Sequence, residues 1–533
     1  MKSIFVVAVL LFTVAASGWN SVIVPNTTRI DIEYFNDNGF DIENVSGSKV
    51  RLYVNEEQEA ILQNMGYRVF IQEVPNLDVA YPTIAEIYAS LQAVVTAHPG
   101  IARLEQIGTS VQGREIYAVI ISDNVNDDEA EPEIRITGNI HGNEKTAGMS
   151  CLNFVEVLTD NYGTSDMCTY VVDNSELWVI TILNPDGYVS GRRYNATGVD
   201  LNRDFSYMNS SSYWQGPESV AIRDLSMQDW PTQDNFINNF ATGLSFHSGA
   251  ECFNAVWNYS TTAVIQDLDL VTAQANAYAN HPSINAYYGA GVWDIWIPGA
   301  SWYATEGDVN DWSYGEMGTV DHTIEVSNIK SDPNWPGIAN ANYMPMLDFC
   351  MTSTYGIYGT VKDGSGSALD ALVEVSLADG IDSEALRFCR TDVVDGGYSK
   401  ALVPGTYNVI VTVDGLGSQS NNGVVVGAEQ MVPVNFVFAT GIEDSSSPGD
   451  LFITVNAAPN PVVSSCNFTL SNTGVEGSLE IYDISGRFVY EENIQAGVTS
   501  HVFNASTELP AGVYQVRYLS GGLSASTRLV VVD

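Results

Sequence analysis

Residues 133–144 read Glu-Ile-Arg-Ile-Thr-Gly-Asn-Ile-His-Gly-Asn-Glu, and this stretch decides much of what the chain can be. Its first half is typical of a strand, and the glycine-bearing loop after it carries His141 and Glu144. An imidazole and a carboxylate three residues apart in such a loop can bind one side of a zinc ion. A catalytic zinc then needs one more protein ligand and an open position for water. The run after Glu144 has apolar residues at helical spacing, so we expect a strand, a metal-binding loop and a helix in succession.

A second His-x-x-Glu motif, His322–Glu325, lies in a segment that is itself typical of a strand. Side chains alternate between the two faces of a strand, and these two residues are separated by an odd number of positions. They therefore point to opposite faces and cannot share a metal ion.

The third ligand has few candidates, because the chain contains only six histidines: His98, His141, His247, His281, His322 and His501. His98 lies at a predicted helix end, His281 precedes a proline in a loop, and His501 belongs to the last domain. His247 ends the strand-like segment 244–247, and we expect it to complete the ligand set.

The composition is that of an acidic globular protein, with 45% apolar residues, 16% charged residues and a net charge of −43. Nucleic acids and anionic membranes bind basic patches, so this charge argues against both as partners. The charge would weakly attract cationic substrates, although the solvated exterior of a secreted protein is the simpler interpretation.

Residues 1–18 are typical of a secretory signal peptide, with Lys2, an apolar run over 4–14 and small residues over 15–18. The run is too short to span a bilayer, and no later apolar stretch reaches that length. We therefore expect a secreted or cell-surface protein without a transmembrane segment. The six cysteines lack Cys-x-x-Cys spacing, which argues against a cysteine zinc site, and their pairing stays open.

The chain divides into several predicted units. Residues 19–79 contain strand, helix and strand signals, and their place after a signal peptide favours a propeptide; a simple N-terminal extension fits as well. Residues 80–354 alternate helical and strand signals, which predicts an α/β fold. A helix is expected over 84–97, and strands over 116–121, 177–183, 244–247 and 323–326. The polar residues of interest follow strand ends, where open α/β sheets bind ligands.

The sequence pattern changes after residue 355, where helical signals give way to short strand-like segments. Short strands separated by glycine, aspartate and proline predict an antiparallel β-sandwich over 355–440. Residues 441–450 are rich in serine and read as a linker, and residues 451–533 predict a second small all-β domain.

Three arginines, Arg192, Arg193 and Arg203, fall between the two halves of the proposed metal site, although arginine is scarce in the chain. A guanidinium binds a carboxylate through two parallel hydrogen bonds. A surface ion pair is the simpler interpretation of any one arginine. A cluster beside a candidate metal site favours carboxylate binding.

Residues 81–350 resemble the zinc metallocarboxypeptidases, the carboxypeptidase A/B and N/E group, and are most similar to the N/E branch. The matching segments are 141–144 (His-Gly-Asn-Glu), 184–187 (Asn-Pro-Asp-Gly), 198–203 (Gly-Val-Asp-Leu-Asn-Arg), 246–249 (Phe-His-Ser-Gly), Trp302-Tyr303 and 323–325 (Thr-Ile-Glu). The resemblance implies a mixed β-sheet flanked by helices, followed by a transthyretin-like sandwich over 355–440.

The resemblance also implies a role for each residue. His141, Glu144 and His247 would hold one Zn²⁺, and Glu325 would be the general base. Arg193 would stabilise the developing oxyanion.

Asn202 and Arg203 would bind the terminal carboxylate of the substrate with help from Tyr303. That binding explains exopeptidase behaviour, since an internal peptide bond offers no carboxylate there.

The segment 307–312 corresponds to the part of the family that forms the specificity pocket, so it bears on substrate preference. Asn310 stands where the basic-specific animal enzymes of the A/B group keep an acid, and Asp308 lies two residues earlier. The resemblance implies broad or basic-tolerant specificity with Asp308 as a substrate-binding residue.

Residues 451–533 resemble the C-terminal sorting domains of bacterial type IX secretion, through segments 458–461, 479–487 and 509–516. That resemblance implies export across an outer membrane and contact with the secretion machinery. A β module for binding or spacing is the alternative.

These patterns predict a secreted zinc carboxypeptidase acting on peptides and proteins with a free C-terminus. A cell-wall peptidase on the same fold, cleaving D-amino acid or isopeptide bonds, is a second interpretation that the carboxylate-binding residues do not exclude. A surface adhesin with an inactive enzyme domain is a third. Loss of a ligand or of the base would favour it, and none is missing.

Overall fold

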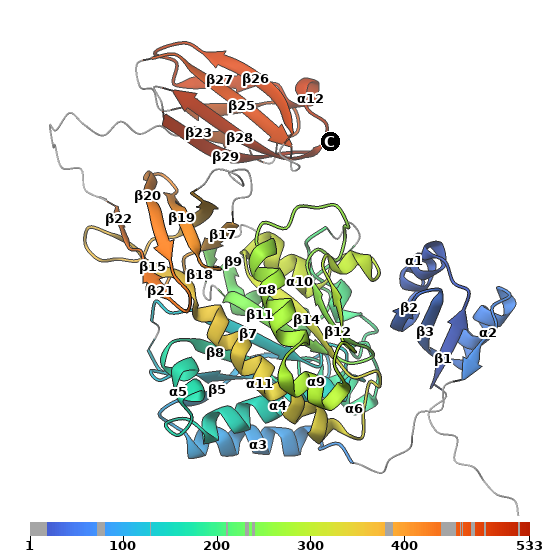
Figure 1. Ribbon diagram of the computed structural model, residues 1–533. Coiled ribbons are helices and arrows are strands. Elements are labelled where there is room, and N and C mark those ends of the chain that lie inside the picture. Colours follow the sequence, from blue (N-terminus) through green and yellow to red (C-terminus); the bar gives the residue numbers. More distant parts are fainter. Residues whose placement is uncertain are drawn as a thin grey trace, which may run out of the picture.

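A computed structural model describes residues 19–71, 80–127, 129–208, 212–229, 234–236, 240–378, 387–438, 455–458, 460, 462–470, 475–483, 487–520 and 523–532 (Figure 1). The predicted signal peptide and the predicted linker over 441–450 lie outside the described residues.

An eight-stranded mixed sheet forms the centre of the region 80–354, in the order β13-β12-β14-β11-β7-β8-β6-β5. The strands are β5 (Ala102–Thr109), β6 (Glu115–Ile121), β7 (Glu133–Gly138), β8 (Glu176–Ile180), β11 (Phe240–His247), β12 (Glu251–Ala255), β13 (Asp294–Trp296) and β14 (Val320–Val326). The four central strands β14, β11, β7 and β8 are parallel and buried along their whole length. Strands buried on both faces are usually apolar, as β8 is after its first residue. β7 and β14 also bury charged side chains, and Arg135 of β7 pairs with Asp321 of β14 at 2.7 Å.

Helices cover both faces of this sheet. One face packs against α3 (Ile84–Ala97), α4 (Lys145–Asp160), α5 (Asp166–Asp173), α8 (Leu268–Ala279), α9 (Pro282–Tyr288) and α11 (Trp335–Thr354) (Figure 1). The other face packs against α7 (Pro217–Ser226) and α10 (Val309–Trp312). The predicted helix over 84–97 is confirmed at both ends, and Thr83 begins it by accepting a hydrogen bond from the backbone of Glu86.

The shorter elements connect these layers. They are α6 (Pro185–Ser190), η1 (Leu201–Arg203), η2 (Gly299–Ser301), η3 (Ser313–Met317), β9 (Met227–Asp229) and β10 (Asp234–Phe236). The predicted strand over 177–183 ends earlier, at Ile180. Ile182 and Leu183 continue the apolar run because they are buried in the two core clusters while the chain already turns towards α6.

Residues 19–71 form a four-stranded antiparallel sheet with two helices and a core of their own. The elements are β1 (Trp19–Pro25), α1 (Arg29–Asp37), β2 (Asp41–Ser46), β3 (Lys49–Asn55), α2 (Glu56–Asn64) and β4 (Phe70–Ile71), and the strand order is β2-β3-β1-β4. The last strand signal of this unit corresponds to β4, which is only two residues long. We call residues 19–71 the N-terminal unit.

The described residues of 356–438 form two packed sheets, β18-β15-β21 with β22 also pairing β15, and β17-β16-β19-β20. The strands are β15 (Gly356–Asp363), β16 (Ala371–Leu377), β17 (Arg387–Arg390), β18 (Gly397–Ala401), β19 (Gly405–Val413), β20 (Gly417–Val426), β21 (Met431–Pro433) and β22 (Phe436–Phe438). The prediction that every pairing is antiparallel is wrong, because β21 and β22 run parallel to β15. After β20 the chain crosses to the other sheet, and there β21 and β22 run in the same direction as β15.

The described part of residues 455–532 is a second pair of sheets, and its strand pairings are antiparallel. Its elements are β23 (Val455–Ala458), β24 (Cys466–Leu470), β25 (Gly477–Asp483), β26 (Phe488–Ile494), β27 (Ser500–Phe503), α12 (Ala505–Glu508), β28 (Gly512–Ser520) and β29 (Leu523–Val531).

The six cysteines are all buried, and none of them forms a disulfide bond. No helix in the described ranges is both long and apolar enough to cross a membrane.

Candidate active site

The loop after β7 lies close against α6 where Gly142 meets Gly187. A Cβ on Gly142 would lie 2.3 Å from the Cα of Gly187, so only glycine allows this loop to pass α6 at that distance. Asn139 adopts a left-handed conformation (φ 52°), and its side-chain amide donates to the carbonyl of His141 and accepts from the backbone of Gly148. These contacts turn the side chains of the loop into the interior.

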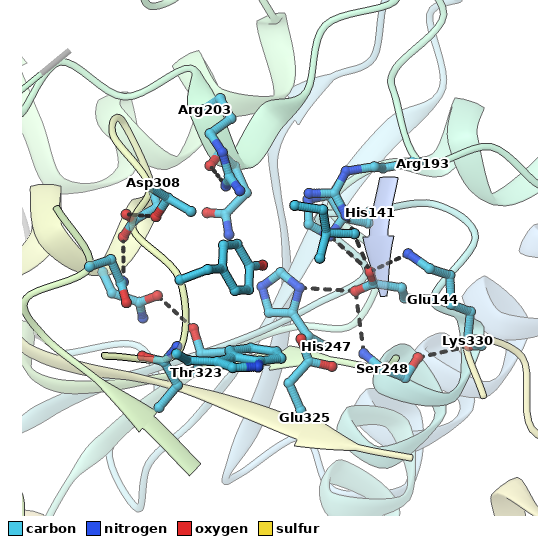
Figure 2. A pocket seen from close by; sticks show the side chains of 18 residues that line it. His141, Glu144, Arg193, Arg203, His247, Ser248, Asp308, Thr323, Glu325 and Lys330 are labelled. Atoms are coloured by element: carbon cyan, nitrogen blue, oxygen red, sulfur yellow. Dashed lines mark hydrogen bonds and ion pairs between the residues drawn. The ribbon is translucent and has the colours of Figure 1, made fainter. Parts of the chain in front are cut away.

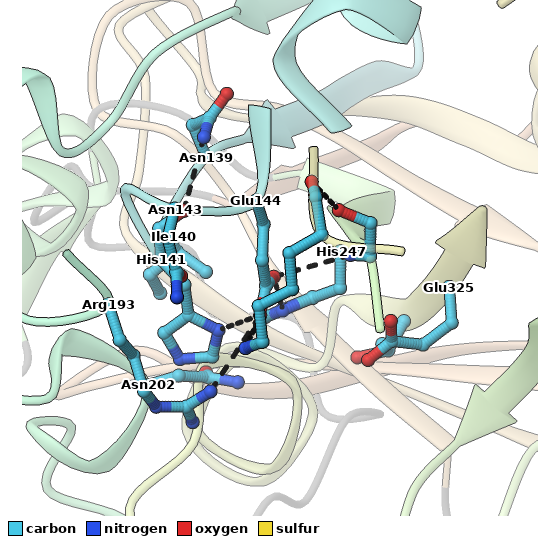
Figure 3. Close-up of polar contacts among 12 residues, drawn as sticks. Asn139, Ile140, His141, Asn143, Glu144, Arg193, Asn202, His247 and Glu325 are labelled. Carbon is cyan, nitrogen blue, oxygen red and sulfur yellow. Dashed lines mark hydrogen bonds and ion pairs between the residues drawn. The ribbon is translucent and has the colours of Figure 1, made fainter. Parts of the chain in front are cut away.

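His141, Glu144 and His247 come together at the ends of β7 and β11, buried, with candidate ligand atoms within 4.8 Å of one another. Glu144 Oε1 lies 3.0 Å from His141 Nδ1, and Glu144 Oε2 lies 2.9 Å from His247 Nδ1. The three residues predicted as metal ligands therefore form one cluster, although His247 is far from the other two in sequence (Figure 3).

The surroundings of this cluster suit a divalent metal ion. Asp200 accepts a hydrogen bond from His141 Nε2 at 3.1 Å, so the other ring nitrogen, Nδ1, faces Glu144. A carboxylate commonly orients a metal-binding histidine in this way. Buried His247 Nε2 has no hydrogen-bond partner among the described residues. Two imidazoles and one carboxylate are a donor set typical of catalytic zinc. The residues present thus fit zinc.

Charge keeps the carboxylates of this cluster ionised. Burial alone would raise the pKa of Glu144, yet its electrostatic interactions and hydrogen bonds with neighbouring groups, above all His141 and Lys330, hold it well below its usual value. Burial opposes ionisation of Asp200 in the same way, and Arg193 and His141 hold its pKa well below the ordinary range. Burial lowers the pKa of His247, which favours the neutral imidazole that a metal ion requires.

Glu325 approaches the same site from β14 (Figure 3). Its register partner in the neighbouring parallel strand is His247, and its Oε2 accepts from the backbone N–H of Ala250 at 3.3 Å. Burial, with repulsion from Glu144, raises the pKa of Glu325 well above its ordinary value, which makes the ionised form a stronger base.

His322 points away from the site, as strand alternation predicts. It is fully buried, contacts Phe253 and Phe349, and forms a 2.9 Å hydrogen bond between its Nε2 and Gln274. Burial lowers its pKa to about 3, so this histidine is a neutral core residue.

The predicted substrate-binding residues line one pocket with the cluster. Arg193 donates from Nε to Asp200 at 2.9 Å. Asn202 is fixed because its side-chain oxygen accepts from the backbone of Val309 at 3.0 Å, and Arg203 donates to the backbone oxygen of Asn202 at 2.6 Å. Tyr303 lines the same pocket and packs against the core of the N-terminal unit.

Asp308 and Thr323 lie on one side of the pocket, and Glu144 and Arg193 lie on the opposite side (Figure 2). Asp308 begins α10 by accepting from the backbone of Asp311 at 3.0 Å. Its side chain thus lines the pocket and also has a structural role.

Three charged residues near the cluster, Asp41, Lys330 and Asp200, were not singled out from the sequence. Asp41, the first residue of β2 in the N-terminal unit, is buried and lies 3.0 Å from Arg193 Nη1 and 2.8 Å from Lys330 Nζ. Lys330 Nζ also lies 3.1 Å from Glu144 Oε1. Asp41 has no local signal, because only folding brings it here. Asp200 could have been found, since it stands two residues before Asn202 in the segment 198–203.

Comparison with known sequences gives two matches. Residues 87–345 match the sequence model of the family described as zinc carboxypeptidase. Residues 456–532 match that of the secretion system C-terminal sorting domain, which indicates export of the protein.

Among curated proteins, carboxypeptidase D of Homo sapiens is 27% identical over 421 residues, which cover 73% of this chain and 29% of that protein. The chain thus spans less than a third of the length of that relative. The carboxypeptidase N catalytic chain of Homo sapiens is 26% identical over 399 residues, which cover 66% of this chain and 84% of that protein.

Among solved structures, the fold is similar to that of thrombin activatable fibrinolysis inhibitor, with a TM-score of 0.51 and 17% identity. The match covers 63% of this chain and 99% of that chain. The predicted mixed α/β fold class is confirmed.

Proposed function

We propose, from the premise that this chain carries a domain of the zinc carboxypeptidase family over residues 87–345, that it is a secreted zinc-dependent carboxypeptidase. Its substrates are peptides and proteins with a free C-terminus, from which it removes single residues. The observation that carries this proposal is the buried cluster of His141, Glu144 and His247 with Glu325 and two arginines around one pocket.

The chemistry divides among the residues of the pocket. His141, Glu144 and His247 would hold the zinc ion, which would supply positive charge to polarise the scissile carbonyl and acidify the attacking water. Glu325 accepts the proton of that water and delivers it to the leaving amine. Burial and the nearby Glu144 raise the pKa of Glu325, so the ionised carboxylate has a high affinity for that proton. Arg193 donates hydrogen bonds to the oxyanion that develops at the carbonyl.

Binding of the chain end falls to Asn202, Arg203 and Tyr303. Arg203 pairs with the terminal carboxylate through its planar fork, and Asn202 is held beside it by its bond to Val309. Asp308 takes part in binding the last side chain. This division makes the enzyme an exopeptidase, because an internal bond brings no carboxylate to Arg203.

The test uses zinc-loaded protein freed of residues 1–79 and pairs of peptides that differ only at the end, a free carboxylate or a carboxamide. We expect single C-terminal residues to be released from the free acids, not from the amides, and chelation to stop the reaction. A D-alanine peptide in the same series tests the cell-wall interpretation. Equal cleavage of acids and amides, or no cleavage of either, would overturn the proposal.

The N-terminal unit is a propeptide that keeps the enzyme latent. Its Asp41 carboxylate lies against Arg193 and Lys330, the cations that face the reacting groups, and Asn36 accepts from Arg203 at 3.3 Å. Ile42 lines the pocket itself. A substrate therefore cannot reach Arg193 and Arg203 until this unit leaves.

The remaining domains serve stability and export. Residues 355–440 form a transthyretin-like domain that is fixed to the catalytic region by buried ion pairs of Lys400 and Arg387 with Asp267. Residues 451–533 contact the secretion machinery, as the sorting-domain match supports. Deleting residues 441–533 should leave peptide hydrolysis unchanged and stop appearance of the protein outside the cell.

A further inference from the structure

The inner wall of the pocket is polar. Beyond the metal cluster and the arginines, it is lined by amide, hydroxyl and carboxylate side chains: Asn254, Asn258, Thr305, Asp308, Asn310 and Thr323. An apolar C-terminal side chain would meet hydrogen-bonding groups there, so the wall does not suit leucine or phenylalanine.

Strand geometry fixes where this wall lies relative to the chemistry. Thr323 precedes Glu325 by two positions in β14, so both side chains are on one face of the strand, roughly 7 Å apart. Asn254 is the antiparallel register partner of Thr323, which places it on the same face of the sheet. If Glu325 serves the scissile bond and Arg203 the terminal carboxylate, this wall receives the side chain of the last residue. The inference rests on the proposed function in this respect.

Asp308 is already engaged by neighbouring donors. One of its oxygens accepts from Asn258 Nδ2 at 2.9 Å and from the backbone of Asp311 at 3.0 Å, and the other accepts from Thr305 Oγ1 at 2.9 Å. Three of the roughly four acceptor positions of a carboxylate are thus used. Asp308 mainly orients Asn258 and Thr305, which weakens the case for it as a partner of a basic side chain.

Two buried amides in the wall each keep one group unpaired. Asn310 is 1% exposed; its oxygen accepts from Thr323 Oγ1 at 2.7 Å, whereas its Nδ2 has no partner in the part of the chain that the structure describes. Asn254 is 8% exposed, and its Oδ1 likewise has none within those residues. A buried polar group without a partner is costly, so a ligand that pairs both is favoured.

We propose that this pocket selects C-terminal residues whose side chain ends in a neutral carboxamide, with glutamine and asparagine as the preferred residues. A carboxamide carries one acceptor for Asn310 Nδ2 and one donor for Asn254 Oδ1. An apolar side chain leaves both unpaired. A glutamate brings two acceptors towards the oxygens of Asn254 and Asp308, and a lysine brings only donors and leaves Asn310 Nδ2 unpaired.

The first test measures kcat/KM for peptides that are identical except for a last residue of Gln, Asn, Glu, Met, Lys, Arg or Phe, with the protein freed of residues 1–79. We expect Gln to exceed both Glu and Met by about tenfold or more, because a site built for hydrogen bonds rejects analogues that lack them. A preference for Lys and Arg would assign the selection to Asp308 instead, and a preference for Phe or Met would mean that the wall is not selective. Either result overturns the inference and leaves the proposed function intact.

The second test changes the wall. Asn310→Asp keeps the size and the bond to Thr323 but replaces the unpaired donor by an acceptor, so the ratio of Gln to Lys turnover should fall by about tenfold or more. Asn254→Leu should raise turnover of Met relative to Gln. Asn276→Leu, on the exposed side of α8, is the matched control and should change neither ratio. Unchanged ratios in all three variants would overturn the inference.

A binding measurement separates the two proposals. Calorimetry with free glutamine, methionine and lysine on the zinc-loaded protein tests the pocket without turnover. If no peptide is hydrolysed, the proposed function fails, yet tighter binding of glutamine than of the other two still supports the carboxamide pocket. Equal affinities would overturn it.

Discussion

At the residue scale, Glu325 is the clearest case of a role that depends on surroundings. Its sequence motif, shared with His322, resembles that of the candidate metal ligands His141 and Glu144. Strand alternation separates the two motifs, and the structure agrees: His322 is buried against aromatic rings, while Glu325 lines the pocket. The sequence alone predicts this difference because the two-residue period of a strand is a local property.

Replacing Glu325 by glutamine should remove the base and keep the shape. We expect kcat to fall by roughly a hundred- to ten-thousand-fold, the usual contribution of a positioned base. Zinc content, measured by atomic absorption, should be unchanged, since Glu325 is not one of the three ligands. Activity within tenfold of the parent protein would show that another group is the base.

His322 should make the stability of the catalytic region sensitive to acid. Burial lowers its pKa to about 3 from an ordinary value of 6.5, so between these pH values the unfolded chain binds a proton that the folded chain does not. Stability therefore decreases as pH falls through this window, by about 1.4 kcal/mol per pH unit.

Urea unfolding followed by tryptophan fluorescence measures this slope, because nine of the ten tryptophans lie within residues 80–354. His322→Gln should lower the slope by about that amount, whereas His501→Gln, in the last domain, should not. Equal slopes in both variants would contradict this assignment.

At the scale of elements, the site depends on the loop after β7, which passes helix α6 where Gly142 meets Gly187. The sequence predicts β7, the loop and α4 in order, but it does not reveal that α6 crosses the loop at Gly142. Gly142→Ala would place a Cβ 2.3 Å from the Cα of Gly187 and push the loop after β7 away from α6.

We expect Gly142→Ala to lower stability by about 1–3 kcal/mol and to weaken zinc binding, measured by melting temperature and by competition with a chelator. Gly100→Ala is the matched control, because no atom lies within 4 Å of its added Cβ. Similar effects of both substitutions would mean that the loop approach does not hold the ligands in position.

At the scale of the whole molecule, the N-terminal unit and the catalytic region meet through charge. Asp41 stands between Arg193 and Lys330, and Asn143 Nδ2 lies 3.4 Å from its second oxygen. Further contacts join Tyr194 to Gly39 and Trp302 to Val45. These contacts surround the pocket, so removal of the unit should both open it and free its cations.

Asp41→Asn should therefore raise the activity of the uncleaved chain. Hydrogen bonds between charged groups contribute about 1.5–3 kcal/mol each, so weakening two of them should increase peptide hydrolysis by about tenfold or more. Glu57→Gln, on the exposed side of α2, is the control within the same unit. The protein cleaved after the unit should be unaffected by either substitution, and equal latency of Asp41→Asn and the parent chain would contradict the proposed inhibition.

The α/β class, the helix over 84–97, the candidate zinc ligands and the mainly β character of residues 355–533 could all be predicted from the sequence. Each of these rests on local periodicity, on scarce residues such as histidine, or on motifs contiguous in the chain. Three features depend on tertiary packing: the parallel pairing of β15 with β21 and β22, the approach of Asp41 to Arg193 and Lys330, and the unpaired groups of Asn254 and Asn310 within the described residues. Those features arise where segments distant in sequence are packed together, and burial sets the cost of an unpaired polar group only after packing has removed water.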